Sequence, residues 1–408
     1  MNKNEMIIAE GIKYSLDCYE TQLNNNVMVV GASGSGKTRS VVIPNILQAT
    51  GSYIISDPKG NLYEQYGDYL RNQGYVVNKL DFTEPENSAR YNFFDYIRNT
   101  QDINKIAHMM IYATSPKGGT LEPFWDEAAE LFLQSLIGYL IEAYNKDECN
   151  LRNIFKLLEI SMIDEYDSSS ETPLDVLMKE LKSENQDSYA AGQYNKFRVA
   201  AGKTLKSILI SVNARIGKYD TPEIRKLTST DTVNISAIGN RPTALFVVVS
   251  DTDRSMDGLV NLFFSQAMNE LCYQADKLNK DSRLKVPVRF ILDDFATNCK
   301  IAEFPRMISS IRSRGISTML MIQAESQLEE CYQNDGKTII ANCDTYVYLG
   351  GNDVSTAEAV AKRSDVPVKK ILNMPVGTNW IFRRGHAPIN GINYKLEPTV
   401  NKIEMMER

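Results

Sequence analysis

The chain has 408 residues, of which 43% are hydrophobic and 24% are charged, the composition of a globular protein of two or three domains with a sizeable core. Its net charge of −6 excludes nucleic-acid binding that rests on global charge, so such a role would need a local basic surface. Six scattered cysteines without a C-x-x-C pair, and only two histidines, argue against a disulfide framework, a zinc site and a histidine-based catalytic centre.

The first strong signal in chain order is a complete phosphate-binding loop between a strand and a helix. The apolar strand 27–30 precedes it, and a segment that can begin a helix, 38–48, follows it. Glycines in the loop let successive backbone N–H groups point at one anion, and the helix adds the positive end of its dipole. This order strongly favours nucleotide binding over a glycine-rich loop that binds nothing. The loop is Gly31-Ala32-Ser33-Gly34-Ser35-Gly36-Lys37-Thr38.

Short apolar strands alternate with helical stretches on both sides of a long interruption. Near-continuous apolar strands of this kind indicate an α/β fold with a mainly parallel sheet covered on both faces. The interruption follows the helical period and predicts an all-alpha domain. We therefore expect a nucleotide-binding domain made of residues 1–95 and 236–408, with the all-alpha domain at 96–235. The expected strands are 27–30, 52–56, 74–77 leading to 80–82, 243–249, 288–292, 318–322, 345–349 and 379–382.

The interruption contains two long helical stretches and one loop that we can predict. Pro123 opens an amphipathic helix, and residues 165–171, acidic and rich in serine, predict an exposed loop. Residues 194–219 predict a second long helical segment that carries much basic charge. Binding of DNA phosphates and a merely solvated helix face are equally weighted explanations of that charge. The basic residues are Lys196, Arg198, Lys203, Lys206, Arg215 and Lys218.

Four side chains are the predicted centre of the chemistry. Lys37 is placed to reach the β- and γ-phosphates of a nucleoside triphosphate, and the Thr38 hydroxyl to bind Mg²⁺. Asp293 and Asp294 follow the apolar strand 288–292. We predict that Asp293 holds Mg²⁺ through water and that Asp294 acts as general base on the attacking water. A pair of exposed carboxylates at a strand end is the less favoured alternative.

Three further polar residues are candidates for sensing or completing the nucleotide site. Gln323 ends the strand 318–322 and could contact the γ-phosphate or the water, although it could equally be an ordinary polar residue at a strand end. Arg312 and Arg314 precede that strand, where either one could reach a neighbouring subunit's γ-phosphate as an arginine finger. Solvation at the surface is the competing explanation for both arginines.

Taken in order, these motifs resemble the type IV secretion coupling proteins, which are conjugative DNA-transfer ATPases, in the form found in Gram-positive mobile elements. The resemblance extends from about residue 10 to residue 390. Several of its motifs are specific to that family. Besides the phosphate loop, the similar segments are Ser40-Val41-Val42-Ile43-Pro44-Asn45, Asp57-Pro58-Lys59-Gly60, Phe124-Trp125, Ala201-Gly202-Lys203-Thr204 with Ser207-Ile208, Leu292-Asp293-Asp294-Phe295-Ala296, Gln323, Leu349-Gly350-Gly351-Asn352 and Phe382-Arg383-Arg384-Gly385.

The resemblance implies a RecA-like P-loop NTPase core interrupted by an all-alpha domain, with ATP and Mg²⁺ as cofactors. It implies a hexameric ring that carries nucleotide at each interface. The implied partners are DNA, single-stranded and bound without sequence specificity, a relaxase complex, and the membrane channel proteins of the secretion system. The implied function is an ATPase that drives or licenses transfer of DNA.

The chain departs from the family pattern at three places. Asp294 replaces the usual glutamate, and Asn92-Phe93-Phe94 replaces an Asn-Pro-Phe. No segment offers about 18 uninterrupted apolar residues or a secretory signal, so the family's N-terminal transmembrane anchor has no counterpart here. We therefore expect a cytoplasmic polypeptide that works at the cytoplasmic face of the membrane, as a fragment or as a natural soluble relative that docks on membrane partners.

Two other functions stay open at this point. The shorter carboxylate at position 294 is compatible with a recruitment module that hydrolyses ATP slowly and mainly docks relaxase or protein cargo. A DNA-packaging or chromosome-segregation translocase would share the same core, but the helical interruption and the turn 57–60 argue against it by family analogy.

Overall fold

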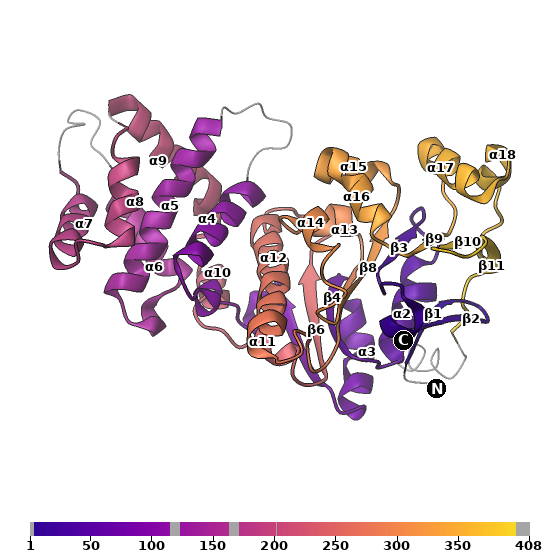
Figure 1. Ribbon diagram of the computed structural model, residues 1–408. Coiled ribbons are helices and arrows are strands. Elements are labelled where there is room, and N and C mark those ends of the chain that lie inside the picture. The colour runs from indigo at the N-terminus through magenta and orange to yellow at the C-terminus, as the bar shows by residue number, and fades with distance from the viewer. Residues whose placement is uncertain (1–3, 115–122, 163–170, 201, 397–408) are drawn as a thin grey trace. The chain divides into compact units, whose positions relative to one another are not determined.

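The computed structural model describes residues 4–114, 123–162, 171–200 and 202–396. Residues 165–170 of the predicted loop, and Ala201 of the family-like segment, lie outside the described residues. The chain divides into two compact units (Figure 1). The first comprises Met1–Thr83, Asn234–Thr252 and Ala267–Arg408, and the second comprises Glu84–Val233 and Asp253–Gln266.

The first unit is built on a nine-stranded sheet with the order β11-β10-β9-β3-β8-β7-β4-β6-β5. The strands from β9 to β5 are parallel to one another, whereas β10 is antiparallel to both of its neighbours. This confirms the predicted α/β class with a mainly parallel sheet. The strands are β3 (Val27–Val30), β4 (Ser52–Pro58), β5 (Val76–Asp81), β6 (Thr243–Val249), β7 (Val288–Leu292), β8 (Ile316–Ile322), β9 (Thr345–Tyr348), β10 (Thr378–Arg383) and β11 (Ile389–Ile392).

Strand prediction was accurate in the buried centre of the nine-stranded sheet, but it missed the edge strand β11 and a separate two-stranded sheet. β3, β6 and β7 have the predicted bounds, because their residues are apolar throughout and buried. The two segments expected at 74–77 and 80–82 form the single strand β5. Hairpin β1 (Glu5–Ala9) with β2 (Ile12–Ser15), and strand β11, were not predicted. β2 and β11 are short, contain no fully buried residue and lack a continuous apolar run.

Both faces of the sheet centre are buried. On one face, alternate residues such as Val27, Val29, Met319 and Met321 belong to one apolar cluster with residues of the helices after β3 and β4. Their neighbours Met28 and Leu320 are also fully buried, as expected for a parallel sheet covered on both sides. The helices of this unit are α1 (Cys18–Thr21), the π-helical turn η1 (Thr38–Val42), α2 (Ile43–Leu47), α3 (Asn61–Asn72), α11 (Ile235–Ile238), η6 (Gln274–Leu278), α13 (Phe295–Asn298), α14 (Phe304–Met307), α15 (Ser326–Tyr332), η7 (Gln333–Asp335), α16 (Gly336–Ala341), α17 (Val354–Ser364) and α18 (Val368–Leu372).

In the described residues of the second unit every regular element is helical, as predicted for the interruption. Helix α5 contacts α4, α6, α8 and α9 and carries the buried centre with Phe132, Leu133 and Leu136 (Figure 1). The helices are η2 (Pro85–Asn87), η3 (Phe93–Tyr96), α4 (Thr100–Thr114), α5 (Pro123–Ala143), η4 (Lys146–Glu148), α6 (Leu151–Glu159), α7 (Pro173–Glu184), α8 (Tyr189–Phe197), α9 (Gly202–Ile216), η5 (Gly217–Tyr219) and α10 (Pro222–Leu227). Helix α12 (Asp257–Tyr273) contributes residues to both units.

The single helical segment expected at 194–219 is wrong as a continuous helix. Helix α8 ends at Phe197, and α9 begins at Gly202, whose φ of +55° lies in the left-handed region that interrupts a helix. Arg198 caps α8 and forms an ion pair with Asp175 at 2.9 Å. Within the described ranges, none of the helices has the length and apolarity needed to cross a membrane.

Candidate active site

Apart from Arg312 and Arg314, the predicted site residues lie at the carboxyl edge of the parallel sheet. Strand order β3-β8-β7-β4 places the phosphate loop after β3, Gln323 after β8, Asp293 after β7 and Asp57 near the end of β4. Parallel strands end at the same edge, so four chain segments far apart in sequence meet there. Ligands of open α/β sheets bind at this edge.

The phosphate loop is curled and anchored to neighbouring strands. Gly34 and Gly36 have φ values of +76° and +92°, which side chains with a Cβ rarely adopt. The amide of Ala32 donates to the carbonyl of Gly350 at 2.9 Å. A Cβ on Gly31 would come within 2.5 Å of the Ser35 Oγ. The glycines are therefore required by the backbone path and by close contact, and the family-like segment 349–352 supports the loop from β9.

Lys37 folds back onto the loop. Its Nζ donates to the carbonyl oxygens of Gly31 at 2.7 Å and Ala32 at 3.3 Å, and the residue is buried. Burial lowers the pKa of Lys37, while the nearby carboxylates of Asp294 and Asp293 oppose that shift. The ammonium group thus lies within the loop, where an anionic ligand would take the place of the two carbonyl partners.

Thr38 and Asp293 are in direct contact. The Thr38 Oγ1 donates to Asp293 Oδ2 at 2.5 Å, which joins the start of η1 to the end of β7 across the intervening strand β8. Asp293 is buried, and desolvation raises its pKa, with the hydrogen bond from Thr38 acting against the shift. A hydroxyl beside a buried carboxylate is a hard oxygen donor set of the kind that Mg²⁺ uses.

Asp294 has an unusual backbone conformation. Its φ of +51° is left-handed, it begins α13, and its amide donates to Asp293 Oδ1 at 3.2 Å. Among non-glycine residues, Asp and Asn adopt this region most readily. The backbone at the strand end therefore favours a short carboxylate here, which offers a local reason for the departure from glutamate.

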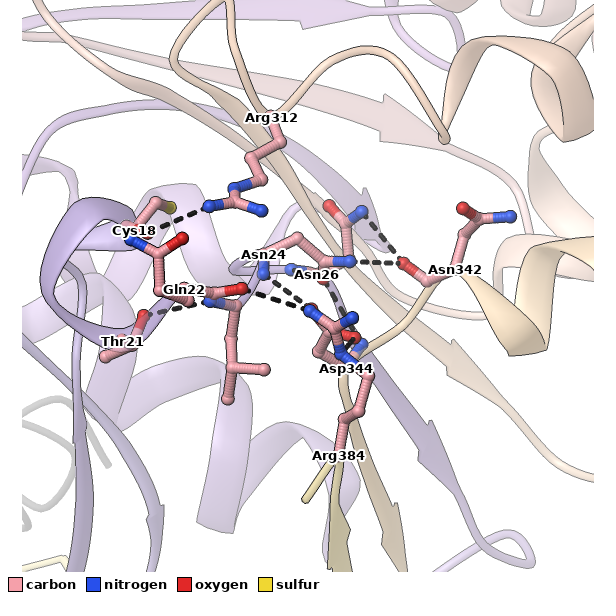
Figure 2. A network of polar contacts seen from close by, with 10 residues as sticks. Cys18, Thr21, Gln22, Asn24, Asn26, Arg312, Asn342, Asp344 and Arg384 are labelled. Carbon is pink, nitrogen blue, oxygen red and sulfur yellow. Dashed lines mark hydrogen bonds and ion pairs between the residues drawn. The ribbon is translucent and has the colours of Figure 1, made fainter. Parts of the chain in front are cut away.

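The remaining candidates divide between the two edges of the sheet. Gln323 is exposed at the carboxyl edge directly after β8, and its amide donates to Gln327 Oε1. Arg312 and Arg314 lie before the amino end of β8, at the opposite edge from the loop of the same chain. Arg314 donates through Nε and Nη2 to Asp276 at 2.8 and 2.7 Å. Arg312 donates to the Cys18 carbonyl at 2.9 Å (Figure 2). Their role as arginine fingers stays a prediction.

Two residues of the site were not assigned by the sequence. Asn393 Nδ2 donates to the Ser35 carbonyl in the phosphate loop at 3.3 Å, although the two residues are 358 positions apart. No local pattern could reveal that contact. Asp57 accepts from the amides of Leu62 at 3.1 Å and Tyr63 at 2.8 Å and so caps the start of α3. The turn 57–60 is one of the family-like segments, and the acidic residue at the end of a strand was the sequence signal that could have assigned Asp57 to the site.

Burial raises the pKa of Asp57 to about 6, because desolvation outweighs the two amide donors, and the charges of Asp293 and Asp81 add to the shift. The folded-state pKa is thus above the unfolded value, so the folded state binds the proton more tightly. Between pH 7 and 4 this group alone makes the folded state more stable as the pH falls.

We expect Asp57→Asn, which resembles the protonated form, to melt at or above the temperature of the wild type at pH 7.5. The advantage should shrink toward pH 5, where wild-type Asp57 gains its proton, and its full size is on the order of 2–3 kcal/mol. Thermal denaturation of both proteins at several pH values measures it. A difference in stability between the two proteins that stays constant from pH 7.5 to 5 would contradict the shifted pKa of Asp57.

Comparisons with known proteins agree with this geometry. Residues 1–364 match the family described as Type IV secretory system Conjugative DNA transfer. The chain is 25% identical over 349 residues to Protein VirD4 of Rhizobium rhizogenes, with 82% of this chain and 48% of that protein covered. It is 22% identical over 358 residues to the conjugal transfer protein TraG of Escherichia coli, with 83% of this chain and 54% of that protein covered. The chain thus spans about half the length of these relatives.

Solved structures with the same fold include those of the bacterial conjugative coupling protein TrwB. The form TrwBdeltaN70 in complex with sulphate has a TM-score of 0.72 at 17% identity, with 96% of this chain and 90% of that chain covered. TrwB in complex with ADP and Mg²⁺ has a TM-score of 0.69 at 17% identity, with the same coverage. This likeness confirms the expected RecA-like fold with its helical interruption.

Proposed function

Because the chain belongs to the type IV secretory system conjugative DNA transfer family, we propose that it is a coupling ATPase, which binds ATP with Mg²⁺, hydrolyses it and engages DNA or a relaxase–DNA complex for transfer. The contact of Thr38 with Asp293 is the observation that carries the proposal. It sets a hydroxyl and a buried carboxylate beside a phosphate loop, as Mg²⁺-dependent cleavage of a nucleotide requires.

Each residue has a defined task in this proposal. The loop amides and Lys37 bind the β- and γ-phosphates, and Lys37 gives up its bonds to the carbonyls of Gly31 and Ala32 to do so. Thr38 and Asp293 would hold Mg²⁺, which neutralises phosphate charge when bound. Asp294 accepts a proton from the attacking water, and Gln323 responds to the γ-phosphate from the end of β8.

The ligands of a relative support the choice of nucleotide. TrwB has been solved with ADP and Mg²⁺ and with the non-hydrolysable ATP analogue ADPNP. We extend both ATP and Mg²⁺ to this chain because its own loop and its own oxygen donors fit them. We further propose a hexamer as the active form, at the cytoplasmic face of the membrane, with the channel proteins of the secretion system as partners.

We propose that the all-alpha domain, placed by the sequence at 96–235, contacts the cargo. Of the basic residues predicted on the segment 194–219, Arg198 is held by Asp175 and Lys196 donates to Gln193 Oε1 at 2.6 Å. Lys203 is exposed at the start of α9 and is the better candidate for a phosphate contact. Such contacts would be insensitive to sequence and weakened by salt.

We expect Mg²⁺-dependent ATP hydrolysis that single- or double-stranded DNA stimulates. Lys37→Ala should abolish turnover, because the loop loses its one ammonium group for the transferred phosphate. Lys13→Ala, which removes an exposed lysine of β2, is the matched control and should behave like the wild type. A phosphate-release assay with and without DNA checks both points.

The alternative is a docking module that hydrolyses ATP slowly, and the shorter Asp294 favours it. In that case DNA would leave the rate unchanged, while ATP would still bind and relaxase or other cargo would still be retained. Full turnover by Lys37→Ala would reject both functions, because the phosphate loop would then not be the catalytic site.

We expect Asp294→Glu to raise turnover. The added methylene moves the carboxylate about 1.5 Å closer to a water placed for attack, and misplacement on this scale can cost about a hundredfold in rate. Asp294→Asn should bind ATP but hydrolyse almost none, because an amide cannot accept the proton.

Glutamate fits the left-handed φ of +51° less well, so Asp294→Glu should also lose stability, on the order of 1 kcal/mol. Single-turnover kinetics and melting curves separate the two effects, and a fall in turnover at unchanged ATP affinity would refute the prediction.

We expect specific activity to rise with protein concentration if an arginine finger acts across a subunit interface. Arg312→Ala and Arg314→Ala then test the two candidates, and the true finger should lower turnover about tenfold or more with ATP affinity nearly intact. The bidentate pair of Arg314 with Asp276 must open before that residue can act, so Arg312 is favoured. Constant specific activity at all concentrations, with neither variant impaired, would exclude a finger.

A further inference from the structure

A cavity of about 270 Å³ opens at the amino edge of the sheet, opposite the phosphate loop. It is formed by residues at the amino ends of β4, β7 and β8 together with the segment around α1. Three arginines line it, namely Arg283, Arg289 and Arg312. The single acidic residue among the lining residues is Asp17. This concentration of positive charge is notable in a chain whose net charge is −6.

Arg289 is the unusual member of this group. It lies on β7 and is only 6% exposed, yet its one hydrogen-bonding partner in the described part of the chain is the Ser317 hydroxyl, at 3.3 Å from Nε. Burial lowers the pKa of Arg289, but a guanidinium stays protonated in proteins. A buried positive charge without a carboxylate is unfavourable unless something neutralises it. Its side chain lines the cavity, so an anion there would supply the missing charge.

The other two arginines add donors without bringing a counter-charge. Arg312 is half-buried and donates to the carbonyl of Cys18 at 2.9 Å, and Arg283 stacks over the ring of Tyr19 at 5.5 Å. Neither forms an ion pair with a carboxylate of the described residues. The Oδ1 of Asp17 accepts from the amides of Tyr19 and Glu20 at 2.8 and 3.2 Å, where it caps α1. The positive charge of the cavity is therefore left largely uncompensated.

The wall that carries Cys18 and Tyr19 is held in place by a polar network (Figure 2). The Asp344 carboxylate accepts a hydrogen bond from the Asn24 backbone amide at 2.6 Å and forms an ion pair with Arg384 Nε at 2.7 Å. The Asn342 carbonyl accepts hydrogen bonds from the side-chain amides of Asn24 and Asn26, both at 3.1 Å. The segment after α1 is thus fixed to β9 and its neighbours. A site whose walls are already ordered loses less entropy when it binds a ligand.

We propose that this cavity binds a phosphate group, as inorganic phosphate or as a small phosphate monoester, with Arg289, Arg283 and Arg312 as its donors. Guanidinium groups match phosphate oxygens in planar, paired hydrogen bonds. The volume approaches that of small-molecule sites, so it leaves room for an organic group beside the phosphate. Tyr19, 71% exposed, offers an aromatic surface for that group. The inference uses no residue of the phosphate loop and shares only Arg312 with the proposed arginine finger, so Arg289 and Arg283 carry its test.

Calorimetric titration of Lys37→Ala protein with inorganic phosphate, and separately with AMP, tests the site with the phosphate loop weakened. We expect binding that Arg289→Met weakens about tenfold or more, as the loss of a charged hydrogen-bond donor does. Potassium chloride at equal ionic strength should give no such binding. Lys285→Met, which removes an exposed lysine outside the cavity lining, is the matched control and should bind as before.

Removal of an uncompensated buried charge should leave Arg289→Met at least as stable as its parent in phosphate-free buffer. If this variant does not fold, Arg283→Met removes a half-buried donor of the same site and should weaken binding in the same direction. Tighter binding of AMP than of phosphate would assign a phosphate monoester as the ligand, and the reverse would assign the free anion. Equal phosphate affinity in Lys37→Ala protein with and without Arg283→Met or Arg289→Met would overturn the proposal.

Alkylation of Cys18 locates the bound anion. Burial raises the pKa of the Cys18 thiol, and the charges of Arg312 and Arg283 oppose that rise, so an anion that screens the arginines should slow its reaction. Cys272, a partly buried cysteine outside the cavity lining, serves as internal reference in the same mass-spectrometric experiment. Protection of Cys18 alone supports the site, whereas equal rates with and without phosphate at both cysteines would place the anion elsewhere.

Discussion

The order of strands β3-β8-β7-β4 is the constraint on which the rest of the site depends. It places a phosphate loop, a glutamine and two acids at one edge of the sheet, although they come from residues 31–38, 323, 293 and 57. The 2.5 Å hydrogen bond from Thr38 to Asp293 depends directly on this order, because it joins the ends of β3 and β7 across β8. A different neighbour for β7 would separate the metal donors and leave the loop without an acid. Burial of both sheet faces holds these apolar strands in the centre of the sheet.

Charge is distributed unevenly between the two edges of that sheet. The carboxyl edge brings Asp293 and Asp294 close to Lys37, with Asp57 near Asp293, and burial shifts the pKa values of Lys37, Asp293 and Asp57 against ionisation. A bound cation and a triphosphate would offset these costs together, the cation on the acids and the anion on Lys37. The amino edge has the opposite character, with arginines at 283, 289 and 312 around one cavity. Both edges thus hold buried charge for which a ligand of opposite sign is the natural partner.

Local backbone conformation explains two features that motif comparison only registers. Asp294 has a left-handed φ at the point where β7 turns into α13, and a short acid tolerates that turn better than glutamate does. Asp57 also has a structural role, because its carboxylate accepts hydrogen bonds from two backbone amides at the start of α3 and lies near Asp293. In both cases the acidic side chain also meets a local requirement of the backbone. Substitutions there should therefore be tested for stability as well as for activity.

The sequence by itself determined the phosphate loop, the acids after β7, the α/β class and the helical interruption, because each depends on contiguous residues or on local periodicity. It did not determine the separate hairpin of β1 with β2, the edge strand β11, the break between α8 and α9, or the contact of Asn393 with the phosphate loop. The tertiary structure alone decided that Arg312 and Arg314 lie at the edge opposite their own phosphate loop, and that Arg289 joins Arg312 at one cavity. The physical reason is that the direction and order of the strands set these distances, and packing over the whole sheet decides that order.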